Sequence, residues 1–369
     1  MPNSFSLYLD IVRFSAAFLV FLYHSRNIYG YESLVFKLGH EAVVIFFVMS
    51  GFIIAYCFDT KEKKLSDFVI NRASRIYSVA IPALCLTLLL DMSGAAINPA
   101  AYGDFFDLPW LRFLSSLLFT NEIWFISIQS FSNVPYWSIN YEVWYYISFA
   151  AAFYFKRPLL LLTLIALLLG PKIVLLAPFW WIGVWIYNRN PLASLPTWLN
   201  TLLFGCSLIG FYLFVANGTS YAGWNLLESW LGKEYFRELA FSRYVISDYL
   251  LALIISLNFA SARVLAANIE INENRVTHFI RTFANLTFAL YLMHQPLLNF
   301  FDAVLAEYSL DPKLHHLLVS GITFILIVAI GSKIENTKYL YRRFFRSVHQ
   351  RLNSLSGTIK AKPSRVEPN

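Results

Sequence analysis

The sequence predicts an all-α protein, a polytopic bundle of about ten transmembrane helices with both termini in the cytoplasm. Three observations support this fold class. Hydrophobic residues make up 58% of the 369 residues and charged residues only 14%, whereas a soluble domain carries about 25% charged residues. Apolar runs recur along the chain at lengths close to the roughly 20 residues that a membrane helix needs. Lys and Arg residues gather in alternate connections between these runs, as the positive-inside rule describes.

Ten apolar runs can serve as spans, although the sixth is short. They lie at 7–24, 38–58, 76–92, 137–155, 158–175, 177–187, 198–216, 244–261, 283–301 and 314–332. A further run, 111–130, contains four charged or amide side chains. If it were an eleventh span, the later basic loops would move to the outer side, against the positive-inside rule. We therefore expect this run to be re-entrant or interfacial.

The distribution of charge gives the orientation and the domain organisation. The loop at 59–75 contains five Lys and Arg residues, and the C-terminal segment is also basic, so both are expected on the cytoplasmic side. The net charge of +7 therefore reports topology rather than binding to nucleic acid. We expect one transmembrane domain over residues 1–346 and a basic, disordered cytoplasmic tail over 347–369. The three cysteines lie inside apolar runs and show no metal-binding spacing.

The first run carries two residues that are unusual in a membrane helix, Arg13 and His24. They are eleven positions apart, which places them on one helix face and about 16 Å apart along the axis. A cation within the membrane is costly unless it faces the bundle interior or a wet cavity, so Arg13 marks a candidate site. In the alternative, Arg13 extends to the cytoplasmic headgroups and His24 simply lies at the outer interface.

The second run begins at the outer level, where His40 and Glu41 are expected near His24. Further along, Ser50 and Gly51 present a small surface that suits either close helix packing or a direct role.

Arg72 and Arg75 lie three residues apart, and hence on one face of a helix at its cytoplasmic end. Two guanidinium groups at this spacing suit phosphate oxygens. Anchoring to lipid headgroups explains the same pattern equally well.

The fourth run opens with Trp137 and Ser138 at the outer interface, and Glu142 follows one turn deeper on the same face as Ser138. We expect Glu142 at the depth of His24, where a carboxylate would fix the imidazole tautomer and orient it as a base. The alternative is a structural ion pair between Glu142 and an Arg of another helix.

The ninth run contains Tyr291 and His294 three residues apart, followed by Pro296. Proline removes a helical hydrogen bond and kinks or breaks the helix. A histidine beside such an irregularity indicates either a cavity or a purely structural role.

These motifs, in this order, resemble those of the membrane-bound acyltransferase-3 family, the bacterial inner-membrane acyltransferases that O-acylate surface glycans. The resemblance extends from residue 9 to about residue 346. It is carried by LDIVRFSAAFLVFLYH, FFVMSGF, the Arg72 and Arg75 pair followed by Ile76, WSINYEVWYY and LYLMHQP. The chain departs from the family pattern at Tyr77-Ser78 and at Glu335-Asn336-Thr337, where the family often has a proline.

The resemblance implies transfer of an acyl group, above all acetyl, from cytoplasmic acyl-CoA to a hydroxyl of a cell-surface or exported glycan. It implies acyl-CoA as co-substrate with no permanently bound cofactor and no metal. The expected partners are a glycan or lipid-linked glycan acceptor and membrane lipids, without nucleic acid. Direct transfer and an acyl-histidine intermediate both remain open.

The expected roles fall into three groups. The catalytic group is His24 as general base with Arg13 and Glu142, the acyl-CoA-binding group is Arg72 and Arg75, and the pore and acceptor group is Tyr291, His294, Trp137, Ser138 and Glu41. An alternative hypothesis is a transporter or flippase, which would move a glycan or acyl intermediate along a polar pathway through the ten helices without catalysing a reaction. That hypothesis predicts two matching halves, and the sequence shows no internal repeat.

Overall fold

The computed structural model describes residues 1–28, 30, 33–103 and 107–360, and within them all regular secondary structure is helical. The α-helices are α1 (Asn3–Ser25), α2 (Gly39–Thr60), α3 (Leu65–Ile97), α4 (Pro109–Leu117), α5 (Trp137–Tyr154), α6 (Pro158–Leu169), α7 (Pro171–Arg189), α8 (Thr197–Ala216), α9 (Thr219–Glu238), α10 (Val245–Ala266), α11 (Arg275–Ala284), α12 (Thr287–Leu305), α13 (Pro312–Asn336) and α14 (Lys338–Lys360). Short 3-10 helices are η1 (Arg26–Ile28), η2 (Leu34–Lys37), η3 (Pro99–Ala101), η4 (Val134–Tyr136) and η5 (Ala240–Tyr244). The predicted all-α class is confirmed.

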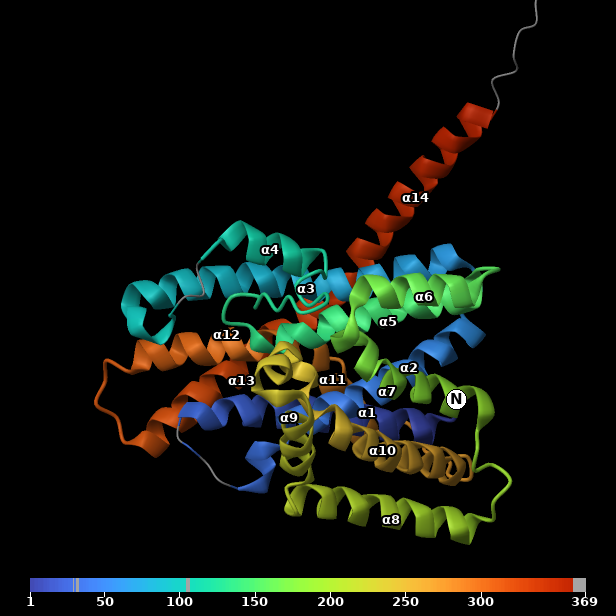
Figure 1. Cartoon of the computed structure of the whole chain (residues 1–369), viewed down its shortest axis with the longest axis horizontal. Helices are drawn as coiled ribbons and strands as arrows, with labels where there is room; N and C mark the ends of the chain where they lie inside the picture. The colour runs from blue at the N-terminus through green and yellow to red at the C-terminus, as the bar shows by residue number, and fades with distance from the viewer. Residues whose placement is uncertain (29, 31–32, 104–106, 361–369) are drawn as a thin grey trace, which may run out of the picture.

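The helices that correspond to the ten predicted spans run roughly along the long axis of the molecule (Figure 1). Six helical stretches of the described chain are long and apolar enough to cross a membrane by themselves. They are α1, α2, α3, α8, the stretch 240–266 and the stretch 312–354. The remaining four spans, α5, α6, α7 and α12, are shorter or more polar and pack within the same bundle.

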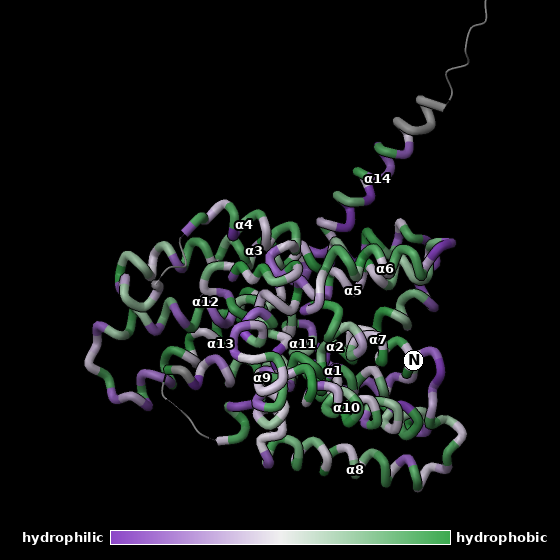
Figure 2. The backbone as a smooth tube through the Cα atoms, in the orientation of Figure 1, coloured by the Kyte–Doolittle hydropathy of each residue, from purple (hydrophilic) through white to green (hydrophobic). Residues whose placement is uncertain are grey.

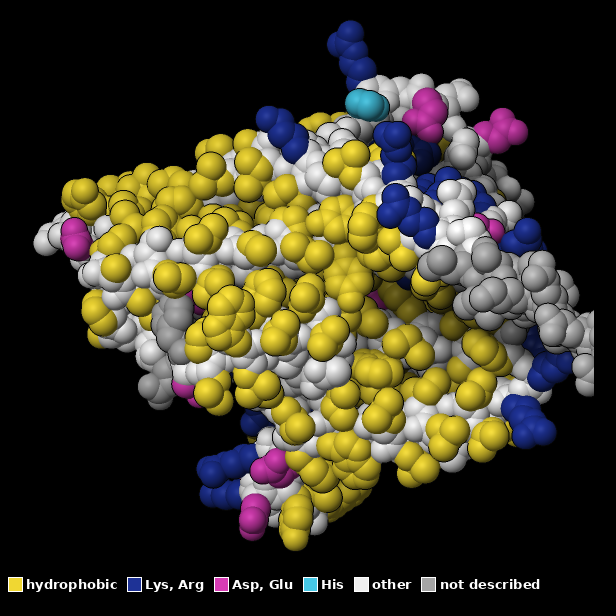
Figure 3. All heavy atoms as spheres, turned by 90° about the horizontal axis from the view of Figure 1, so that it is seen from above, with side chains coloured by type: hydrophobic (Ala, Val, Ile, Leu, Met, Phe, Trp, Pro, Cys, Tyr) yellow, Lys and Arg dark blue, Asp and Glu magenta, His cyan; other side chains and the backbone are white. Residues whose placement is uncertain are grey.

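The surface fits this arrangement, because hydrophobic side chains form a broad band on the face seen in Figure 3. Lys and Arg side chains gather on that face toward the end from which α14 projects. The N-terminus lies toward the same end (Figure 1). We call this the basic end of the bundle, and the positive-inside rule predicts that it is cytoplasmic. In Figure 2 the helices that cover the bundle, such as α6 and α8, are largely hydrophobic along their length.

The boundary between the fifth and sixth spans differs from the prediction. The runs 158–175 and 177–187 were expected, whereas the chain breaks at Gly170, between α6 and α7. Gly170 has φ +78°, and a Cβ there would lie 2.7 Å from the Cα of Trp124, so this position requires glycine. Pro171 then starts α7 with its fixed φ.

The segment 111–130 does not form a spanning helix. Its helical part, α4, has nine residues and is therefore about 14 Å long, less than half of the hydrocarbon core. The hydroxyl of Tyr77 donates to the carbonyl of Leu117 at 3.2 Å, about 18 Å along α3 from its first residue. The chain then returns toward the other end of α3, where Ser132 bonds the carboxylate of Asp91. It therefore turns back within the bundle, as a re-entrant segment does, and ends beside Asp91 inside α3.

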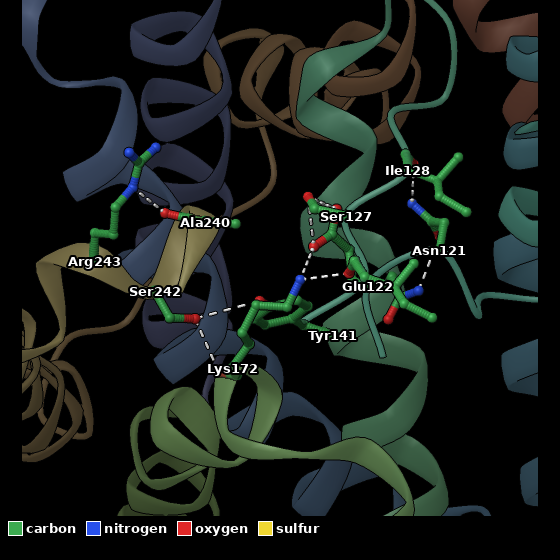
Figure 4. Close-up of polar contacts among 11 residues, drawn as sticks. Asn121, Glu122, Ser127, Ile128, Tyr141, Lys172, Ala240, Ser242 and Arg243 are labelled. Carbon is green, nitrogen blue, oxygen red and sulfur yellow. Dashed lines mark hydrogen bonds and ion pairs between the residues drawn. The ribbon is translucent and has the colours of Figure 1, made fainter. Parts of the chain in front are cut away.

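A buried ion pair holds this re-entrant segment inside the bundle (Figure 4). The Nζ of Lys172, at the start of α7, lies 2.9 Å from Oε2 of Glu122, and the two side chains are 0% and 1% exposed. Ser127 donates to both oxygens of Glu122, and Lys172 also donates to the carbonyl of Ile126. Irregular backbone at membrane depth is tolerated only where the protein satisfies its polar groups, as it does here.

The predicted boundary at residue 346 falls within a helix, because α14 runs from Lys338 to Lys360. The division into a transmembrane domain and a cytoplasmic tail stays a prediction. Residues 361–369 lie outside the described residues. Helix α14 carries exposed Leu340 and Phe344 among basic residues, the composition of a helix that lies on a membrane surface.

We predict that the Lys172–Glu122 pair is strongly coupled. Lys172→Met leaves a buried carboxylate without its partner and should destabilise the protein by about 3–5 kcal/mol. Adding Glu122→Gln should recover most of this loss, because the amide still bonds Ser127. Unfolding in detergent, followed for both single variants and the double variant, gives the coupling energy. Additive losses would show that the pair does not hold the segment.

We also predict the orientation of the bundle from the position of its basic loops. In a chain whose own cysteines are replaced, cysteines at Lys63 and Ser354 should be inaccessible to a membrane-impermeant thiol reagent added to intact cells. A cysteine at Tyr221, whose side chain is exposed, should be labelled. Labelling of position 63 from outside would reverse the orientation.

Candidate active site

A cavity of about 370 Å³ lies between α1, α2, α3, α5, α12 and the start of α14. Its lining includes five cationic side chains and one carboxylate. They are Arg13, Arg72, Arg75, Lys338, Arg342 and Glu142. A concave site with this excess of positive charge suits a ligand that carries several negative charges.

Arg72 and Arg75 both line this cavity, as the prediction of a ligand-binding pair requires, but their surroundings differ. Arg72 donates to Oε1 of Glu62 at 2.7 Å, and Asn71 donates to the same oxygen at 2.8 Å. The guanidinium of Arg75 lies over the ring of Phe288, with its central carbon 5.9 Å from the ring centroid. Within the described part of the chain no carboxylate lies within ion-pair distance of Arg75. Arg72 therefore also anchors the 61–64 loop, whereas Arg75 is available to a ligand.

Lys338 and Arg342 bring a second basic element to the same cavity, although the charge of the C-terminal segment predicted only its orientation. Both lie in the first turns of α14. The Nε of Arg342 is buried and lacks a hydrogen-bond partner. Their contribution depends on how α14 turns back toward α3, which no local pattern of the sequence reveals.

Arg13 faces the bundle interior rather than the lipid headgroups. It lines the cavity and lies 3.5 Å from Asp10, one turn earlier on α1. Ten residues separate Arg13 from the first residue of α1, which places it about 15 Å from the basic end.

Glu142 does not lie beside His24, so the predicted pairing is wrong. The hydroxyls of Ser50 and Tyr146 both donate to Oε1 of Glu142, at 2.6 and 2.5 Å. Because the re-entrant segment precedes it, α5 begins inside the membrane. Glu142 is thus twelve residues, about 18 Å, from the end of α5 at Tyr154, close to the depth of Arg13 and on the same cavity. His24 is twenty-one residues, about 31 Å, from the start of α1.

The sequence left open whether Ser50 and Gly51 serve helix packing or the site itself, and each residue has one of these two roles. Ser50 lines the cavity, bonds Glu142 and accepts from the indole N–H of Trp180 at 3.1 Å. Gly51 packs against α7, since a Cβ there would lie 1.9 Å from the carbonyl oxygen of Trp180.

The structure brings His24 to His294 instead of Glu142. The two ring centroids are 5.1 Å apart. His294 is fully buried, and its Nδ1 lies 2.9 Å from the carbonyl oxygen of Leu290. A carbonyl only accepts, so Nδ1 carries the proton and Nε2 is an acceptor, and this Nε2 has no partner. His294 therefore offers a lone pair beside the His24 ring.

Pro296 does not break α12, which runs continuously across it. The proline leaves the carbonyl of Leu292 without its helical donor. Asn133, at the end of the re-entrant segment, donates to this carbonyl at 2.8 Å. The carbonyl freed by Pro296 thus connects α12 to the re-entrant segment through a hydrogen bond.

Tyr291 and Ser138 lie together on the cavity lining, with their oxygens 2.7 Å apart. The ring of Tyr291 is 6.3 Å from that of His294. His24 and His294 are not on the lining itself, so Tyr291 lies between the cavity and the histidine pair.

Two predicted acceptor residues lie elsewhere. Trp137 stacks on Phe241 of η5 at 4.6 Å, a packing role. Glu41 is buried under α9, where Ser220 donates to its Oε1 at 2.5 Å. Neither residue lines the cavity.

His40, next to Glu41, pairs with a carboxylate that was not among the predicted site residues. Its Nε2 lies 2.9 Å from both oxygens of Asp248, a fully buried residue near the start of α10. An acidic residue within an apolar run is the signal that points to such a partner.

Comparison with known proteins supports an acyltransferase. Residues 6–332 match the family model described as an acyltransferase domain. The exopolysaccharide production protein ExoZ of Rhizobium meliloti (strain 1021) is 26% identical over 227 residues. That alignment covers 52% of this chain and 63% of the relative, so the chain spans less than two thirds of the relative's length. No solved structure matches.

Proposed function

This chain belongs to the membrane-bound acyltransferase-3 family, and on that premise we propose that it moves an acetyl group from cytoplasmic acyl-CoA to a hydroxyl of a cell-surface or exported glycan in the bacterial inner membrane. The observation that carries the proposal is the cation-rich cavity between α1, α3 and α14. The name of the similar protein ExoZ, an exopolysaccharide production protein, supports a polysaccharide as acceptor.

The basic end of the cavity suits the phosphates of coenzyme A. Arg75, Lys338 and Arg342 come from two helices and face the same space, and guanidinium groups bind phosphate oxygens through paired hydrogen bonds. The pantetheine arm would extend past Arg13 toward Tyr291, along a lining that becomes more aromatic, with Phe46 and Phe47. The side chain of Tyr291 would then separate the acyl thioester from the histidine pair.

His24 acts as the general base in this proposal. A ring nitrogen takes the proton of the sugar hydroxyl as its oxygen attacks the thioester carbonyl. The carbon–sulfur bond then breaks, the ester forms, and the departing thiolate of coenzyme A recovers the proton from the imidazolium. His294 would supply the orientation first expected from Glu142, since its Nε2 can accept the N–H of His24. The side chain of Gln295, the next residue of α12, also lies close to the His24 ring.

Arg13 and Glu142 serve the donor rather than the base. Their shared depth in the cavity places one cation and one carboxylate along the route of the pantetheine arm. Arg13 would position the thioester, and Glu142 would hold Ser50 and Tyr146 in place through its two hydrogen bonds.

We predict that the cavity cations hold the donor. Arg75→Ala and Arg342→Ala should each raise KM for acyl-CoA about tenfold or more, because a charge-assisted hydrogen bond is worth about 1.5–3 kcal/mol, while KM for the acceptor stays constant. Arg343→Ala removes the neighbouring, exposed arginine of the same helix and is the matched control. Release of coenzyme A by purified protein gives both constants. Equal changes in KM for both substrates would instead support the alternative that these residues anchor the protein to lipid headgroups.

We predict that His24→Asn lowers turnover by at least about two orders of magnitude, the usual contribution of a general base. Asparagine preserves hydrogen bonding without basicity, so the protein should still fold and insert. The acid limb of the pH–rate profile, where the imidazole becomes protonated, should be absent from the residual activity. His278→Asn, on exposed α11, should behave as the wild type.

Near-normal turnover of His24→Asn would assign the base to another residue, and His294 would be tested next. A protein that carries acyl or glycan groups across the membrane without releasing coenzyme A would instead be a transporter.

A further inference from the structure

A second cavity, of about 490 Å³, opens on the lipid-facing side of the bundle between α1, α11 and α13. Its walls are mainly aromatic: Phe14, Phe18 and Phe21 from α1, Phe283 from α11 and Phe324 from α13. No charged side chain is among its lining residues. We call this cavity the phenylalanine groove.

The groove is formed by rings that pack against one another over a floor of small residues. Phe14 contacts Phe283 edge to face at 5.2 Å, and Phe18 contacts Phe324 in the same way at 5.7 Å. Between the helices lie Ser320 and Gly321. A Cβ built on Gly321 meets no atom within 4 Å, so the space there is open.

One end of the groove, at Phe21, lies beside the histidine pair. The ring of Phe21 is 6.3 Å from that of His294, and His24 follows Phe21 by three residues on the same helix. On α13, Ser320 bonds His316, whose Nε2 lies 3.4 Å from the hydroxyl of Ser25. The end of the groove at Phe21 thus lies next to the site at which the proposed function places the acceptor hydroxyl.

The length of the groove indicates what occupies it. From Phe21 to Ile11 it follows α1 for ten residues, about 15 Å, and it continues against α11 toward the basic end. It therefore passes the midpoint of α1, near Phe14. A phospholipid of the outer leaflet ends at the middle of the roughly 30 Å core, whereas a polyisoprenyl chain with its head at His24 extends beyond it.

We propose that the phenylalanine groove seats the polyisoprenyl chain of a lipid-linked glycan acceptor and so holds its sugar at His24. This inference rests on the proposed function and names the acceptor class. Arg26 lies just beyond His24, its guanidinium 4.2 Å from the centroid of the Tyr23 ring, and supplies positive charge where the phosphate between lipid and sugar would lie.

Photo-crosslinking tests the groove directly. The full chain in phosphatidylcholine nanodiscs is irradiated with a polyisoprenyl diphosphate-linked glucose that carries a diazirine on its chain. The wild type and His24→Asn should be labelled on α1 and α13. Gly321→Phe fills the open space and should lower this labelling at least about tenfold. The matched control is Gly205→Phe on α8, where a Cβ also meets nothing within 4 Å.

Undiminished labelling of Gly321→Phe would overturn the proposal. Equal labelling of the groove by a diazirine phosphatidylcholine at the same mole fraction would also overturn it, because the groove would then hold ordinary bilayer lipid only. Photolabelling does not depend on acyl transfer. The groove could therefore be labelled even if the wild type transfers no acyl group, and that result would refute the proposed function alone. Where transfer is measured, Gly321→Phe should raise KM for the lipid-linked acceptor and leave KM for acyl-CoA unchanged.

Discussion

The structure depends on one constraint, that irregular backbone within the hydrocarbon core must find its hydrogen-bond partners inside the protein. The re-entrant segment shows how this is met, because its irregular backbone is bonded from three sides. Lys172 and Glu122 fasten it to α7, Asp91 fastens it to α3, and Asn133 fastens it to α12. A fully buried ion pair gains little net energy on its own, yet its loss on one side is costly. Such a pair therefore specifies a unique position for the segment more than it adds stability.

This fastening decides where the polar residues of α5 lie. Since the re-entrant segment ends inside the bundle, α5 begins there too, and Glu142 reaches the level of Arg13 instead of His24. The charged cavity is consequently confined to the basic half of the molecule, and the histidine pair lies beyond Tyr291. In the proposed function, an anionic donor and a glycan acceptor that approach the membrane from opposite sides would thereby meet separate surfaces, with the side chain of Tyr291 between them.

Much of this could be predicted from local patterns. The 3.6-residue period placed Arg72 and Arg75 on one helix face, and both line the cavity. Loop charge gave a span order that the helices follow. The predicted depth in the membrane was wrong for Glu142, because that depth depends on the path of the irregular segment before α5. Contacts between helices that are distant in the sequence were also not predicted. His24 meets His294 across 270 positions, and α14 returns Lys338 and Arg342 to the cavity, through tertiary packing that no single run of sequence encodes.

If His24 is the general base, as proposed above, its position beside a second histidine rather than a carboxylate has a physical rationale. A resting base must be neutral, and a carboxylate beside it in a poorly hydrated site would carry a desolvation cost of several kcal/mol throughout the cycle. Two neutral imidazoles avoid that cost, because the proton on Nδ1 of His294 is fixed by the carbonyl of Leu290 and its Nε2 remains an acceptor. In the proposed mechanism, charge would then appear at His24 only while it holds the proton of the acceptor hydroxyl. The carboxylate of Glu142 is kept instead in the cavity with five cations, where its charge is compensated.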